Sequence, residues 1–114
     1  MAISSPAFAG ASYLDKTASP PVEAKGEGEV LTISAPTDSV YAGVSGDVVL
    51  EDKGRETPLT IRNQLGWEDT VVWSPFGDEN MGYDSFVCVE SAKASSPVVL
   101  GPSEYWTGAM DVVA

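Results

Sequence analysis

Hydrophobic and polar positions alternate over short distances along the chain rather than at helical spacing. No window carries apolar residues three and four positions apart for three turns. Runs rich in Val, Ile, Thr, Tyr and Trp recur instead, each closed by Gly, Pro, Asp or Ser. The predicted strands are Ser12 to Leu14, Val30 to Ser34, Val40 to Ala42, Val48 to Leu50, Leu59 to Asn63, Thr70 to Trp73, Phe86 to Glu90, Val98 to Leu100 and Tyr105 to Val113. This spacing predicts an all-β fold, an antiparallel β-sandwich formed by residues 1–114 as a single domain.

Three polar segments between these runs are predicted to be connections. "TASPPVEAKGEGE" is expected to be a surface loop, and "EDKGRETP" a hairpin turn with Lys53-Gly54 at its tip. "SPFGDENMGYDS" is expected to be a longer loop that opens with Pro75, whose missing N–H ends the preceding strand. "FAGASYLDK" has no predicted strand before it, as though the chain began partway through a sheet.

The stretch "FVCVES" places an acid, Glu90, inside an apolar strand. In strand geometry Phe86, Cys88 and Glu90 share one face, so partial desolvation beside an aromatic ring and a thiol would suit Glu90 to proton transfer. The alternative is that Glu90 lies at the wet end of the strand. If the strands on either side of the "SPFGDENMGYDS" loop pair, Trp73 comes within reach of Glu90.

Two further residues are candidates for ligand contacts. Asp15, in "YLDK", either ends a strand at a turn or binds a ligand. Trp73, in "VVWSP", is either a core residue or a platform for a ligand. Three Trp and four Tyr in a small β domain favour carbohydrate, since pyranose rings stack on aromatic faces.

Composition removes several classes of function. The net charge is -11, with six dispersed cations, so nucleic acid and anionic membranes are poor partners, and most of the cations around a bound phosphate must come from elsewhere. The chain has no histidine, and its one cysteine, Cys88, is expected to be a buried apolar residue. No Cys/His cluster, phosphate loop or calcium loop occurs, so we expect no metal and no other cofactor. With no recognisable secretion signal, the expected location is cytoplasmic.

Read in order, six segments resemble the final portion of the aldose 1-epimerase family, in the branch of the hexose-6-phosphate mutarotases (glucose-6-phosphate 1-epimerases). They are "GASYLDK", "TDSVY", "DTVVWSP", a Met in the following loop, "FVCVESA" and "VVLGPSEYWTGAM". The resemblance runs from about residue 10 to the end. It implies part of a galactose-mutarotase-like supersandwich whose concave face binds a pyranose, and an isomerase that interconverts the α and β anomers of a sugar phosphate.

The resemblance also implies roles for individual residues. Glu90 matches the family's catalytic base, which takes the proton from the anomeric hydroxyl while a histidine protonates the ring oxygen. Asp15 matches an aspartate that binds sugar hydroxyls, and Trp73 is expected to pack beneath the site. Ser74 departs from the family pattern, which has Asn after this Trp.

The resemblance covers roughly the last third of the family domain. The family's histidines and phosphate-binding arginines belong to the other part, so the expectation is a C-terminal fragment that is inactive alone. Such a piece would expose sheet edges and self-associate, or pair with the missing N-terminal portion. The alternatives are a non-catalytic carbohydrate-binding β-sandwich and a structural remnant without ligand.

Overall fold

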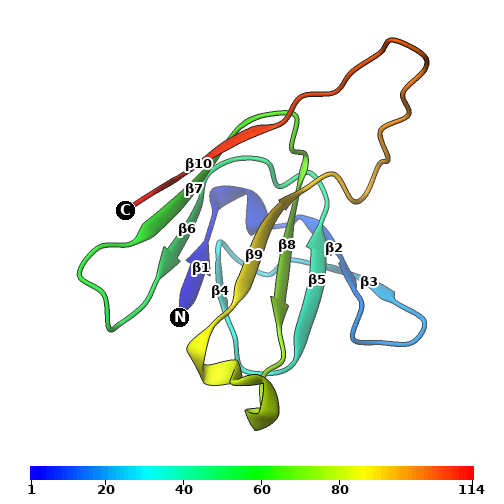
Figure 1. Cartoon of the computed structure of the whole chain (residues 1–114). Coiled ribbons are helices and arrows are strands. Elements are labelled where there is room, and N and C mark those ends of the chain that lie inside the picture. Colours follow the sequence, from blue (N-terminus) through cyan, green and yellow to red (C-terminus); the bar gives the residue numbers. More distant parts are fainter.

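Ten short strands form two antiparallel five-stranded sheets in the computed structural model, which describes residues 1–114 (Figure 1). Sheet A has, in spatial order, β10 (Ala109–Val113), β7 (Leu59–Leu65), β6 (Val48–Glu51), β1 (Ala2–Ser4) and β4 (Val30–Thr32). Sheet B has β3 (Val22–Lys25), β2 (Ser12–Asp15), β5 (Thr37–Tyr41), β8 (Asp69–Ser74) and β9 (Cys88–Ala92). The other elements are single 3₁₀ turns, η1 (Pro6–Phe8), η2 (Glu79–Met81) and η3 (Tyr83–Ser85). The predicted all-β sandwich is confirmed.

The core lies between the two sheets, and alternation along each strand decides which side chains enter it. Seven apolar residues are buried there: Ile3, Phe8, Tyr41, Val44, Val48, Ile61 and Val72. The Tyr41 ring packs against Phe8 and Tyr13, with centroid distances of 4.9 and 4.8 Å. Only 12 of 114 residues are buried, so this core is small and much apolar surface stays exposed.

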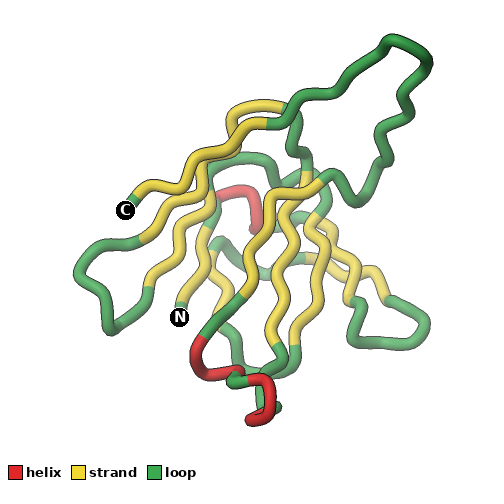
Figure 2. The backbone as a smooth tube through the Cα atoms, viewed as in Figure 1, coloured by secondary structure: helices red, strands yellow, loops and turns green.

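The two sheets are offset by one strand. Ser91 of β9 donates a hydrogen bond to Asn63 of β7, so β9 lies opposite β7. Sheet A continues past β7 to β10, whereas sheet B ends at β9. The tube view shows β10 at this margin of the molecule (Figure 2). The inner face of β10 therefore has no strand of sheet B opposite it.

Seven of the predicted strands occur in the structure, with shifted ends, as do the β6–β7 hairpin and the loop that opens with Pro75. An eighth, Tyr105 to Val113, is shortened to β10. The prediction of a strand at Val98 to Leu100 is wrong: these residues lie in the long connection from β9 to β10, between Pro97 and Gly101, with no pairing partner.

Two strands were missed because neither has a strong pattern of its own. The three residues of β1 are held by pairing on both sides, with β4 and β6. The strand β3 lies inside the segment predicted to be a loop, and its pairing with β2 holds it in a sheet. β2 itself pairs with β3 and β5, both of which follow it in the chain.

None of the helical turns has the length or apolar character to span a bilayer.

Candidate functional site

Glu90 lies on the outer face of sheet B, the face that points away from sheet A. The register aligns Leu14, Val40, Val71 and Glu90 in one row across β2, β5, β8 and β9. Cross-strand partners share a face, so Glu90 ends a row of three apolar side chains. Leu14 is 39% exposed, so this face is partly open to solvent at β2.

Trp73 lies on the same face, diagonal to Glu90. Its direct partner on β9 is Cys88, two residues before Glu90, and such diagonal neighbours lie about 7–8 Å apart between Cα atoms. The expected proximity of Trp73 and Glu90 on paired strands is therefore confirmed. The Trp73 ring is half-buried and packs against Phe86 at a centroid distance of 6.0 Å, which leaves part of the indole on the surface.

Glu90 is exposed, so the partly desolvated position expected from the sequence is not found in this chain. Its direct cross-strand neighbour is Val71, and no hydrogen bond fixes its carboxylate. Cys88, expected to be buried, is also only half-buried. Both residues lie on the edge strand of sheet B, where side chains have neighbours on one side only.

Asp15 lies on the opposite face of sheet B from Glu90. It pairs with Ser39, which faces the core with Val72, and two strands separate β2 from β9. Its carboxylate accepts hydrogen bonds from the Thr17 hydroxyl at 2.6 Å and the Thr17 N–H at 2.9 Å. These bonds, the hydroxyl first, hold the pKa of Asp15 below its ordinary value. The structure does not bring Asp15 and Glu90 together, and the role of Asp15 in sugar binding stays a prediction.

Asp38 is an acidic residue on the outer face that sequence reasoning did not single out. It is the cross-strand partner of Trp73 and is half-buried. Two strand spacings, about 10 Å, separate β5 from β9. The sequence pattern that could have identified Asp38 is its spacing of two residues from Val40 in "TDSVY", because this spacing places both side chains on one face of a strand. The outer face thus presents Asp38 and Glu90 on either side of Trp73 and Val71.

A shallow hollow borders this face near β2 and β3. Its lining includes Leu14, Val40, Lys16 and Glu23, together with Ala94 and Ser95 of the loop after β9. Lys16 and Lys25 are the cations at this end, and Lys25 donates a hydrogen bond to the Ser12 hydroxyl at 3.0 Å. No group of three or more His, Cys, Asp or Glu side chains is arranged to hold a metal ion.

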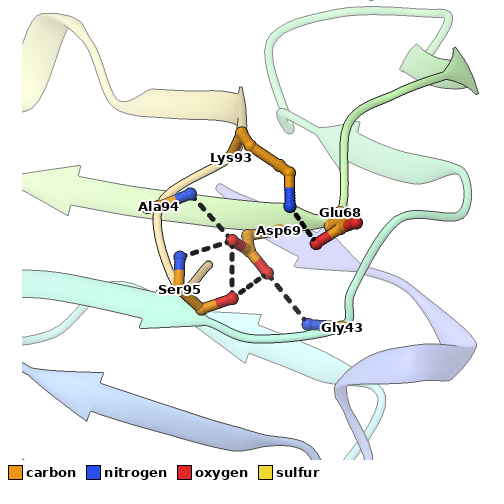
Figure 3. A network of polar contacts seen from close by, with 6 residues as sticks. All are labelled: Gly43, Glu68, Asp69, Lys93, Ala94 and Ser95. Atoms are coloured by element: carbon orange, nitrogen blue, oxygen red, sulfur yellow. Dashed lines mark hydrogen bonds and ion pairs between the residues drawn. The ribbon is translucent and has the colours of Figure 1, made fainter. Parts of the chain in front are cut away.

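A buried carboxylate, Asp69, holds the loop that follows β9. It accepts hydrogen bonds from the N–H of Gly43 at 3.1 Å, Ala94 at 2.8 Å and Ser95 at 2.7 Å, and from the Ser95 hydroxyl (Figure 3). Burial acts to raise the pKa of Asp69, but these hydrogen bonds together outweigh it and lower the pKa. The network joins the start of β8 to the end of β9, and so fixes the end of the strand that carries Glu90.

Comparison with known proteins gives one informative relative. The chain matches no protein-family model and no solved structure. It is 27% identical over 92 residues to a protein of Cenchrus ciliaris named "Putative glucose-6-phosphate 1-epimerase". The match covers 72% of this chain and 27% of that protein's length. The chain is therefore similar, at low identity, to about a quarter of a protein with a sugar epimerase name.

Proposed function

We propose that this chain carries the glutamate-bearing part of an aldose 1-epimerase site that interconverts the α and β anomers of a hexose 6-phosphate. The observation that carries the proposal is the position of Glu90 beside Trp73 on an open, partly apolar sheet face. The similarity to a protein named as a glucose-6-phosphate 1-epimerase supports it.

In the proposed reaction the Glu90 carboxylate takes the proton from the anomeric hydroxyl, and an acid protonates the ring oxygen. The C1–O5 bond then breaks to give the open-chain aldehyde. Rotation about C1–C2 and reversal of both proton transfers close the ring on the other face of C1. Trp73 offers an apolar surface for the sugar ring. Asp38 accepts hydrogen bonds from sugar hydroxyls on the far side of Trp73.

This chain lacks a histidine to supply the acid. A single positioned acid or base contributes about 10²–10⁴-fold to a rate, so Glu90 without its partner gives only part of the acceleration. The isolated chain is therefore a fragment of low activity, and a second polypeptide segment supplies the acid in the complete site.

The first test is two-dimensional NMR exchange between the anomers of glucose 6-phosphate with the purified chain. The rate of anomer exchange with the chain present is expected to exceed the spontaneous rate by a factor of about 100 or less. Glu90→Gln should return it to the spontaneous rate, because the amide cannot accept the proton. Asp38→Asn should weaken sugar binding.

The matched control is Glu23→Gln, at the β3 end of the same face. It should leave exchange unchanged. Exchange that survives Glu90→Gln, or that Glu23→Gln abolishes equally, would contradict the assignment of the base.

The second candidate function is a carbohydrate-binding β-sandwich without catalysis. The exposure of Glu90 favours it, because a carboxylate open to water can accept hydrogen bonds from sugar hydroxyls without taking part in catalysis. It predicts saturable binding of hexoses at Trp73 with no rate enhancement. Sugar-induced shifts of the Trp73 indole resonance, without anomer exchange, would decide for this function.

A further inference from the structure

The inner face of β10 is apolar but uncovered. Met110 and Val112 pair with Asn63 and Ile61 of β7, and Ile61 belongs to the core, so both point toward the interior of the sandwich. They are nevertheless 37% and 60% exposed. The offset between the sheets is the cause, because β9 lies under β7 and sheet B has no strand under β10.

The edge of sheet B next to this gap is also unpaired. The only strand that pairs with β9 is β8, so one side of β9 presents free backbone N–H and C=O groups. A strand added at this edge would lie one spacing beyond β9, under β10. It would receive backbone hydrogen bonds from β9 and cover Met110 and Val112 in the same step.

The charged residues around this edge indicate which kind of strand can bind to it. From Phe76 to Ala92 the chain carries four acids and no Lys or Arg: Asp78, Glu79, Asp84 and Glu90. The next residue, Lys93, is ion-paired with Glu68 and so leaves this acidic charge uncompensated. Pairing of β9 with β9 of a second copy would bring two such acidic segments together, and like charges across strands are destabilising. A strand with Lys or Arg on its outer positions has the opposite effect.

We propose that the free edge of β9 binds an extended, basic strand of another polypeptide by β-augmentation. Alternate side chains of that strand are apolar and pack on Met110 and Val112. The others are Lys or Arg and lie beside Glu90 on the outer face. Main-chain hydrogen bonds supply affinity, and the alternation supplies specificity. This proposal does not depend on a catalytic role for Glu90.

The test uses a capped heptapeptide, KVKVTVK, titrated into the whole chain and followed by amide NMR. Saturable shifts are expected at residues 88–92 and 110–112. The same peptide with Glu in place of Lys, and one with Pro at both its fourth and fifth positions, should both bind at least tenfold more weakly. The first loses the charge match, and the second loses a main-chain donor toward β9 because successive N–H groups point to opposite edges of a strand.

Two variants of β10 separate the proposed contact from general effects. Val112→Lys, on the inner face, should weaken binding about tenfold, the loss expected when a buried valine contact is removed. Val113→Lys, on the outer face of the same strand, is the matched control and should not. Equal effects of the two variants, shifts confined to another edge, absence of saturable binding, or dimerisation of the chain through β9 would each overturn the proposal.

Discussion

Asp69 shows how one residue can hold a loop that has no regular structure. Its side chain has no exposed surface, yet three backbone N–H groups and one hydroxyl satisfy it. A buried ionised carboxylate is stable only when it is paired in this way. The residues that it ties down, Gly43, Ala94 and Ser95, come from two other segments of the chain.

Asp69→Asn is expected to lower the free energy of unfolding by about 2–4 kcal/mol at neutral pH, because the amide leaves some buried N–H groups without a charged acceptor. Urea denaturation measures this. Asp47→Asn, at an exposed position, is the control and should change stability little.

The stability of the wild type and that of Asp69→Asn should depend differently on pH. The folded-state pKa of Asp69 lies below its ordinary value of 3.8, so its stabilisation is complete above that pH and is lost as the pH falls through the lowered pKa. The gap in stability between the wild type and Asp69→Asn should therefore narrow as the pH falls below 3.8 and through the lowered pKa. A gap that does not change with pH would contradict a charged Asp69.

At the scale of elements, a pair of tryptophans fixes the start of β10. Trp67, in the β7–β8 turn, and Trp106, before β10, meet edge to face at a centroid distance of 4.9 Å. Gly108 allows this approach, because a Cβ there would lie 2.5 Å from the Trp106 ring and 2.9 Å from the Trp67 ring. The long connection from β9 is thus held at one end by Asp69 and at the other by this aromatic contact.

Gly108→Ala should destabilise the chain by about 1–3 kcal/mol, because the added methyl overlaps the two indole rings. Hydrogen exchange should locate the effect in the β10 amides. Gly46→Ala is the matched control, since no atom lies within 4 Å of a Cβ at that position. Similar losses in both variants would mean that the packing at Gly108 is not the cause.

At the scale of the whole molecule, the net negative charge opposes the self-association that unpaired sheet edges favour. The edge strands β3, β4, β9 and β10 are all unpaired on one side. Large apolar side chains also lie on the surface, and Val99 and Tyr105 are each 86% exposed. The net charge of -11 acts against contact between copies at neutral pH.

Self-association, expected from the sequence, should therefore depend on pH. Light scattering should detect little association at pH 7 in low salt and strong association near the isoelectric point of about 4.1, where repulsion vanishes. Equal association at both pH values would show that charge does not control it.

The sequence alone determined the fold class and most of the strands, because alternation and turn residues act locally. It also predicted that Trp73 and Glu90 come within reach of one another if their strands pair, and the β8–β9 register placed them on one face. Tertiary structure decided what depends on neighbours distant in sequence. Pairing formed β1 and β3, and the offset of the sheets left the inner face of β10 without a strand opposite it. The strand order and register of sheet B put Glu90 on the outer face of an edge strand and Asp15 on the opposite face, two strands away. Burial and pairing of this kind arise only when remote segments meet, so no local pattern could predict them.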